Sequence, residues 1–127
     1  MTSIDADGWE LVSAEDCNAA HPNTFHIPTR EQREKLATGD GAKLLFEIEN
    51  RENGRVTGRG VERMWVIVKA RNDGGYIGVL DSDPVTAENL QVRKGDVIAF
   101  GPEHVAAIST PPRAYVLEKY GASFFEE

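Results

Sequence analysis

The sequence predicts an α+β fold in which a strongly curved antiparallel sheet, or a partly open small barrel, is flanked by two short helices. Three observations support this prediction: strand-like alternation fills the middle of the chain, turn-forming residues follow the strand-like runs, and two segments carry helix-start signals. The length of 127 residues suits one domain with its own core. We therefore expect a single domain over residues 1–127, with an extended arm at 1–24 and a C-terminal helix and tail at 111–127.

Both ends of the chain carry apolar residues that can pack on the sheet. Residues 1–24 are polar and weakly periodic, which indicates a short strand or extended arm. Pro111-Pro112 favours the start of a final helix over Arg113 to Tyr120, and Gly121 favours its end. The apolar residues available for docking are Trp9, Leu11 and Val12 in the arm and, in the tail, Phe124 and Phe125, which should fold back or contact a partner.

Another helix is predicted after Thr29. Thr29 and Gln32 have the spacing of a capping box, in which the threonine side chain accepts from the backbone N–H of Gln32 and the glutamine side chain reaches back. The helix should continue to about Thr38, because Gly39-Asp40-Gly41 favours a helix end.

The segment that follows predicts a β-hairpin. From Ala42 to Asn50, apolar residues occupy alternate positions, which is the pattern of a strand with one buried face. Asn53-Gly54 then marks a tight hairpin turn. The return strand carries Gly58 and Gly60, which favour a bulge or bend over regular pairing.

The run from Val61 to Arg71 is predicted to be the central strand, and both of its faces are apolar. Each apolar face of a sheet has to be covered. We favour a cover made by the helix after Thr29 or by the C-terminal segment; the alternative places Trp65 in a groove or at a subunit interface, where aromatic residues are enriched. One face presents Met64, Val66, Val68 and Ala70, and the other presents Val61, Trp65 and Ile67.

Two more strands are predicted, Tyr76 to Leu80 and Val97 to Phe100. The turn sequence Asn72-Asp-Gly-Gly75 precedes the first, and Lys94-Gly-Asp96 precedes the second. Gly78 would let a neighbouring backbone or side chain come close. Short carboxylates are expected to cap turns by accepting bonds from backbone N–H groups, at Asp81, Asp83 and Asp96.

The charge balance opposes two classes of partner. Lys and Arg total 14 against 21 Asp and Glu, so the net charge is -7 and the field of the whole molecule repels nucleic acid and anionic lipid. We expect neither nucleic acid nor a membrane as a partner. The arginines between Arg55 and Arg71 are interspersed with glutamates, and we interpret them as a solvated strand face.

The single cysteine, Cys17, cannot form an intramolecular disulfide, which is typical of a protein in a reducing compartment. The first eight residues lack a basic and then apolar pattern, and the sequence contains no apolar run near the ~20 residues that span a bilayer. We therefore expect a soluble, cytoplasmic protein.

The sequence predicts no catalytic residue, no metal and no cofactor. Asp81-Ser-Asp83 is not followed by the inner ligands of a calcium loop, and Gly58-Arg-Gly60 is followed by neither a helix nor the Lys-Ser or Lys-Thr of a phosphate loop. The residue types that bind zinc lack the paired spacing of a structural zinc site. These candidate ligands are Cys17, His21, His26 and His104.

Two functions are therefore weighed. The first is a non-catalytic binding or interaction module whose curved sheet faces a protein or small ligand, with a homodimer among the expected arrangements. The second is a small hydrolase or metal-assisted enzyme that uses His104 with Asp81 or Asp83, because loops at strand ends often carry sites. We favour the first. The residues predicted to bind the ligand or partner are Trp65, Tyr76, Asp81, Asp83 and His104.

Several motifs resemble a family of small bacterial domains known only as a domain of unknown function, number twenty-three fourteen. They are Arg63-Met-Trp-Val-Ile-Val68, Tyr76-Ile-Gly-Val-Leu-Asp-Ser-Asp-Pro84, Arg93-Lys-Gly-Asp-Val-Ile-Ala-Phe100 and Glu103-His-Val105, which together cover roughly a third of the chain. The family pattern ends in Asp-Trp, whereas this chain has Ala106-Ala107-Ile108. The resemblance implies a fold and no activity.

Overall fold

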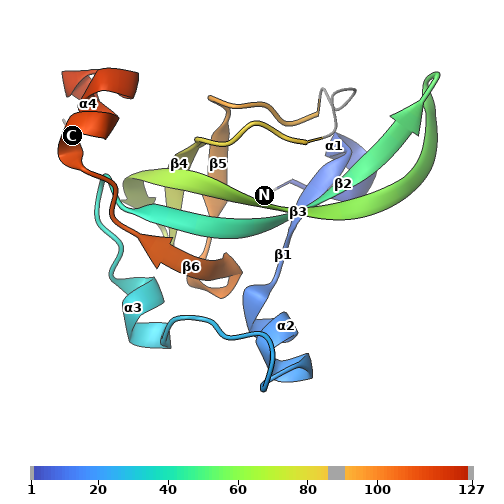
Figure 1. The fold of residues 1–127 in the computed structure, drawn as a ribbon, viewed down its shortest axis with the longest axis horizontal. Coiled ribbons are helices and arrows are strands. Elements are labelled where there is room, and N and C mark those ends of the chain that lie inside the picture. Colours follow the sequence, from blue (N-terminus) through green and yellow to red (C-terminus); the bar gives the residue numbers. More distant parts are fainter. Residues whose placement is uncertain (1, 86–90, 126–127) are drawn as a thin grey trace.

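The computed structural model describes residues 2–85 and 91–125, and its strands form one curled antiparallel sheet with the shape of a half-barrel (Figure 1). Helices flank the sheet, so the predicted α+β fold is confirmed. The last two residues of the predicted tail lie outside the described residues. The helical segments are α1 (Ile4–Asp7), α2 (Ala14–Ala20), α3 (Arg30–Glu34), η1 (Pro102–His104), α4 (Arg113–Tyr120) and η2 (Ala122–Phe125). The strands are β1 (Trp9–Val12), β2 (Gly41–Glu52), β3 (Arg55–Asn72), β4 (Gly75–Leu80), β5 (Val97–Phe100) and β6 (Val105–Ser109).

The sheet has the order β1-β2-β3-β4-β5, and β6 also pairs with β2. All of these pairs are antiparallel. The residues of β2 that pair with β6 are Gly41 to Leu44, and those that pair with β1 are Leu45 to Ile48. Because β3 occupies the other edge of β2, strands β1 and β6 follow one another along the same edge. The sequence pattern did not predict β6.

The β2–β3 hairpin begins its return at the predicted turn and extends away from the rest of the sheet (Figure 1). Asn53 and Gly54 have φ of 51° and 80°, the left-handed geometry of a two-residue hairpin turn that asparagine and glycine tolerate best. The pairing register shifts between Asn50 and Arg51, beside Gly58. The predicted hairpin and the predicted bulge are both confirmed.

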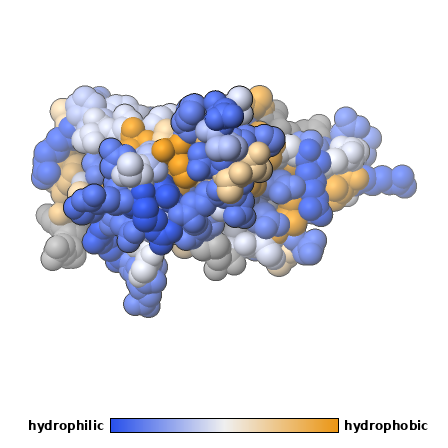
Figure 2. All heavy atoms as spheres, turned by 90° about the horizontal axis from the view of Figure 1, so that it is seen from below, coloured by the Kyte–Doolittle hydropathy of each residue, from blue (hydrophilic) through white to orange (hydrophobic). Residues whose placement is uncertain are grey.

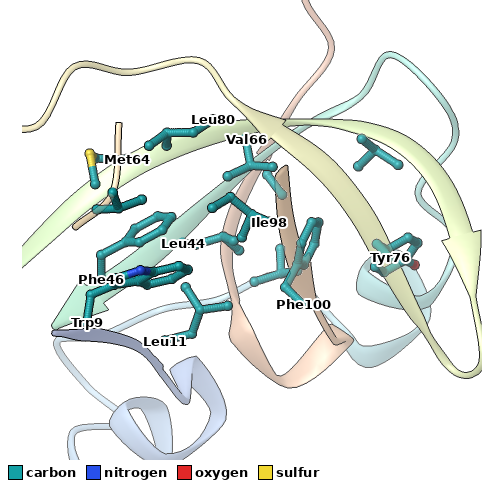
Figure 3. Close-up of a cluster of buried hydrophobic side chains, with 14 of the residues drawn as sticks. Trp9, Leu11, Leu44, Phe46, Met64, Val66, Tyr76, Leu80, Ile98 and Phe100 are labelled. Atoms are coloured by element: carbon teal, nitrogen blue, oxygen red, sulfur yellow. The ribbon is translucent and has the colours of Figure 1, made fainter. Parts of the chain in front are cut away.

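The main core fills the concave face of the sheet (Figure 3). Alternate residues of β2 point into it, and so do Met64, Val66 and Val68 of β3, as the alternation predicted. Ala70, predicted on the same face, is exposed, because the register with β4 shifts between Val68 and Ala70. Burying one such side chain stabilises the fold by roughly 1.5–3 kcal/mol. Figure 3 labels Trp9, Leu11, Leu44, Phe46, Met64, Val66, Tyr76, Leu80, Ile98 and Phe100 of this core.

The other apolar face of β3 is covered at one end by the C-terminal segment. Ile67 packs against Val116 of α4 and Phe124 of η2 in a smaller second cluster. The C-terminal segment, and not α3, thus supplies the cover. The ammonium of Lys69 donates to the carbonyls of Ser123 and Phe124, which fastens η2 to β3.

The N-terminal arm contains more helix than the sequence predicted. The expected short strand is present as β1, but α1 precedes it and α2 follows it. Ser3 and Ser13 cap these helices by accepting from the backbone N–H groups of Ala6 and Asp16. Both helices are short, so their apolar periodicity is too brief to detect, and serine caps alone are weak signals.

Helix α3 has the predicted capping box between Thr29 and Gln32, yet it ends at Glu34 and not near Thr38. The backbone N–H of Leu36 donates to the hydroxyl of Tyr76, 3.2 Å away, in place of a helical carbonyl. A tertiary contact therefore ends this helix early. Helix α4 begins and ends as predicted, and across the described residues no helix combines the length and hydropathy needed to cross a membrane.

Candidate functional site

Two of the five predicted binding residues, Trp65 and Asp81, line one recess on the convex side of the sheet. Its volume is about 230 Å³, and we call it the Trp65 recess. The start of β2, the middle of β3, the end of β4, the end of β6 and the start of α4 meet there. The lining residues are Gly41, Trp65, Ile67, Asp81, Ser82, Ser109, Pro111 and Tyr115.

Backbone pairing holds the two predicted residues together. Strand β4 ends at Leu80, opposite Val66 of β3. The chain then continues along β3, because the backbone N–H of Asp81 donates to the carbonyl of Trp65 at 2.9 Å and the N–H of Trp65 donates to Ser82 Oγ at 3.0 Å. The position of Asp81 beside Trp65 therefore follows from the register of the sheet.

The carboxylate of Asp81 binds side chains of α4. Tyr115 donates its hydroxyl to Oδ2 at 2.7 Å, Tyr120 donates to Oδ1, and Lys119 Nζ lies 3.8 Å from Oδ1. The Asp81 side chain is only 9% exposed, and both of its oxygens are in use. The prediction that Asp81 caps a turn is therefore wrong. The same prediction for Asp96 is confirmed, because Asp96 accepts from the backbone N–H of Arg93 at 2.8 Å.

The same carboxylate sets the electrostatics of the two phenols. The hydrogen bond to Asp81 is the main cause that raises the pKa of Tyr115, and burial followed by that bond raises the pKa of Tyr120. Lys94 acts in the opposite direction on the pKa of Tyr115. Both tyrosines are therefore hydrogen-bond donors at neutral pH, with their protons directed to Asp81.

Lysine ammonium groups lie over both aromatic rings of the recess. Lys43 Nζ is 5.3 Å from the ring centroid of Trp65, and Lys119 Nζ is 5.1 Å from that of Tyr115. These distances are typical of cation–π contacts. Lys43 is opposite Trp65 in the β2–β3 register, and Lys119 is one helical turn after Tyr115.

Trp65 retains an unused polar group. Its side chain is partly exposed, and its indole N–H donates to no acceptor within residues 2–85 and 91–125. A tryptophan whose N–H is buried usually has a partner for it. Trp65 thus contributes an aromatic ring to the recess and carries an available hydrogen-bond donor, on a strand that is paired along both edges at Val66.

Tyr76, a third predicted residue, lies in the main core. Its hydroxyl donates to the carbonyl of Arg33 at 2.6 Å and accepts from the N–H of Leu36, and its ring centroid is 5.3 Å from that of Phe100. It is 2% exposed. The structure therefore gives Tyr76 a role in joining α3 to the sheet.

His104 and Asp83 are also separate from the Trp65 recess. His104 is buried, its Nδ1 accepts from the N–H of Gly101 at 2.9 Å, and burial lowers its pKa. Asp83 is exposed. A histidine–aspartate pair that acts as general base needs bonding contact, and among the described residues no hydrogen bond joins His104 to Asp81 or Asp83.

A partly buried ion pair lies near His104 and was not predicted from the sequence. Arg33, which is 5% exposed, donates to Glu15 at 2.6 Å and to the carbonyl of Pro102 at 2.9 Å. The bond from Arg33 is the main cause that lowers the pKa of Glu15. These contacts join α2, α3 and η1. Nothing in the local sequence marks Arg33 as buried, since arginine is usually exposed.

A larger hollow of about 890 Å³ lies beside the end of β3 and carries several cations. Arg71 donates to the carbonyl of Glu34, and Lys35 pairs with Glu31 at 2.7 Å. Lys69 binds the carbonyls of η2 described above. Each of these cations already binds a group of the protein itself, so we place the candidate site at the Trp65 recess.

The remaining surface is predominantly polar. Hydrophilic residues dominate the face in Figure 2, and the hydrophobic residues there form small, separate groups. Small apolar groups of this kind are ordinary for a folded protein and do not by themselves mark a site. The large hydrophobic residues exposed in the described part of the chain are Val56, Val61, Val85, Val97 and Tyr115.

Within the described ranges, no three His, Cys, Asp or Glu side chains are grouped as a metal site requires. Comparison of the chain with family models, curated proteins and solved structures finds no match. The resemblance over Arg63 to Val105 therefore stays a prediction. Function has to be argued from the geometry of the Trp65 recess.

Proposed function

We propose that this chain is a non-catalytic binding module whose partner docks at the Trp65 recess. The observation that carries the proposal is Trp65 itself, whose side chain lines the recess and whose indole N–H has no acceptor in the described part of the chain. Tryptophan is enriched at interfaces because it combines a large apolar face with one polar group. A partner that supplies an acceptor would complete this hydrogen bond.

The surroundings of Trp65 support the proposal because they are already in place. Strand β3 is held by β2 and β4 on its two edges, and Asp81 is held by Tyr115 and Tyr120. A site formed before binding loses little conformational freedom when the partner arrives. We further propose a cytoplasmic location, which suits the single cysteine, Cys17.

The proposal is tested by comparing three immobilised proteins in the same cell extract: the unaltered chain, Trp65→Ala and Val61→Ala. Val61 is on the same strand and is 56% exposed, so its variant controls for loss of an apolar side chain outside the recess. Proteins and small molecules retained by each are quantified by mass spectrometry. A retained species is then purified and its Kd measured by calorimetry.

We expect Trp65→Ala to weaken binding at least tenfold, the effect of losing a central aromatic contact worth about 1.4 kcal/mol or more. Val61→Ala should bind as the unaltered chain does. Circular dichroism and a thermal unfolding curve establish that both variants are folded. If every retained species binds folded Trp65→Ala with an unchanged Kd, the recess is not the docking site and the proposal fails.

A further inference from the structure

We infer that the Trp65 recess receives a single carboxylate side chain, aspartate or glutamate, from an acidic segment of a partner protein. The inference rests on the proposed function and specifies its ligand. It follows from which polar groups of the recess are already used, from the positions of its lysines and from its size.

The polar groups of the recess differ in whether they are already bonded. The carboxylate of Asp81 accepts from Tyr115 and Tyr120, so both of its oxygens are in use. The indole N–H of Trp65 can only donate, whereas the hydroxyls of Ser82 and Ser109 can donate as well as accept. An incoming acceptor is therefore compatible with all three of these groups.

Two lysines of the chain already lie over the aromatic rings of the recess. An aromatic recess beside a carboxylate would ordinarily attract an ammonium or guanidinium group. Here Lys43 already lies over the ring of Trp65, and Lys119 lies over Tyr115 and near Asp81. The chain's own lysines thus already form a cation–π contact with each aromatic ring, although neither lysine is among the residues that line the recess. Their N–H groups can form charge-assisted hydrogen bonds to an incoming carboxylate.

The volume of the Trp65 recess limits the size of its ligand. The recess encloses about 230 Å³. Clefts for drug-sized ligands enclose roughly 300–1,000 Å³. The recess is below that range and suits one side chain, which favours a peptide segment over a free cofactor or nucleotide.

The net charge of -7 opposes an acidic partner at long range but does not decide the outcome at the recess. Charges separated by more than about 8 Å are largely screened at physiological ionic strength. The local groups are Lys43 and Lys119, with Lys94 close enough to act on Tyr115, and the charge of Asp81 faces the two phenols. An acidic side chain at the recess therefore has Lys43 beside it, together with Lys119, which also pairs with Asp81.

The test uses three blocked pentapeptides, Ala-Glu-Ala-Glu-Ala and the matched sequences with Gln or Lys in place of Glu. Each is titrated into the full ¹⁵N-labelled chain while amide and indole N–H resonances are recorded. The Trp65 indole resonance is identified by its loss in folded Trp65→Phe. We expect the Glu peptide to shift this resonance saturably, and to bind at least fivefold more tightly than the Gln peptide.

Matched lysine variants test the role of these two lysines. Lys43→Gln and Lys119→Gln should each weaken binding of the Glu peptide about threefold, because a single partly exposed charge contact contributes little. Lys35→Gln should leave the Kd within twofold, because Lys35 is exposed, pairs with Glu31 and lies outside the recess. Raising the salt concentration should weaken binding of the Glu peptide and leave binding of the Gln peptide unchanged.

Three results overturn the inference. If the Lys peptide shifts the Trp65 indole resonance and binds more tightly than the Glu peptide, the recess binds cations. The inferred carboxylate ligand would then be wrong, although the recess would still be a binding site. Equal binding of the Glu and Gln peptides would remove the role of charge. If no peptide shifts the indole resonance, the acidic-segment ligand is wrong, while the comparison of Trp65→Ala with Val61→Ala decides independently whether the recess binds anything.

Discussion

At the scale of single residues, polar side chains join segments that lie far apart in the sequence. Asp81 connects the end of β4 to α4 through two phenol hydroxyls. Arg33 connects α3 to α2 and η1 through Glu15 and the carbonyl of Pro102. An unpaired group left behind by removing one partner costs about 1–3 kcal/mol. These bonds therefore specify how the helices dock on the sheet.

His104 makes the stability of the fold depend on pH. Burial lowers its pKa below the ordinary value of 6.5, so the unfolded chain binds the proton more readily than the folded protein. The stability that neutral His104 contributes is fully present above pH 6.5, and it is lost as the pH falls through the lower pKa of His104 in the folded state. We expect the free energy of unfolding, measured in urea, to decrease from pH 7 to pH 5.

His104→Asn should remove most of this decrease, because an amide oxygen can accept from the N–H of Gly101 without titrating. His21→Asn is the matched control, because it makes the same substitution at an exposed histidine. The lowered pKa of Glu15 contributes separately, below pH 4.5, where its stabilising charge is lost. An unchanged slope between pH 7 and 5 in His104→Asn would contradict the assignment.

At the scale of elements, the β3–β4 pair depends on a glycine that the sequence analysis identified as a point of close approach. A Cβ added at Gly78 would lie 2.5 Å from Val66 Cγ1 and 2.6 Å from the carbonyl oxygen of Ile67. Neither neighbour is the end of a flexible side chain. The two strands could then remain paired only if one of them moved.

We expect Gly78→Ala to lower the free energy of unfolding by about 3 kcal/mol, the upper part of the usual range for overpacking. Gly58→Ala is the matched control, because no atom lies within 4 Å of a Cβ built there. It should change stability by no more than about 0.5 kcal/mol. Both are measured by urea unfolding; a loss below 1 kcal/mol in Gly78→Ala would contradict the close approach.

The elements that could be predicted were those specified by local signals. Asn53-Gly54 predicted the hairpin, and period-two alternation predicted its inward face. The early end of α3 could not be predicted, because it arises from a bond between Leu36 and Tyr76, 40 residues apart. Strand β6 was missed for a similar reason, as its partner β2 lies far earlier in the chain.

The candidate site was predictable in part. Trp65 and Asp81 were identified from the sequence, and Lys43 could have been, because the hairpin turn with one bulge at Gly58 places it opposite Trp65. Tyr115, Tyr120 and Lys119 could not, since they reach Asp81 only after α4 docks on the sheet. Tyr76 and His104 show the converse: a polar side chain near a strand end can serve the interior of the fold.

At the scale of the whole molecule, stability should be distributed unevenly. The middle of β3 pairs with β2 and β4 and is apolar on both faces, whereas the hairpin tip around Asn53 pairs only within itself and is exposed. Local opening free energies range from near zero at such tips to the global value in a core strand. We therefore expect the hairpin tip to open more readily than the middle of β3.

Hydrogen exchange measures this distribution. We expect backbone N–H groups of residues 52–57 to exchange faster than those of 64–68 by a factor on the order of 100 or more. Residues 44–46 of β2 should match the slow group, because β2 is paired on both edges there. Equal protection along the hairpin would mean that the tip is held by contacts beyond its own two strands.

The shared edge of β2 also affects how the protein folds during synthesis. The edge of β2 at Leu44 cannot pair with β6 until Val105, the partner of Leu44, has been synthesised and has left the ribosome. At roughly 5–20 residues per second, synthesis of the 61 residues from Leu45 to Val105 takes roughly 3–12 s. Until then that stretch of backbone has unsatisfied N–H and C=O groups and can pair with another nascent chain. Variants that slow translation late in the message should therefore increase aggregation more than those that slow it early.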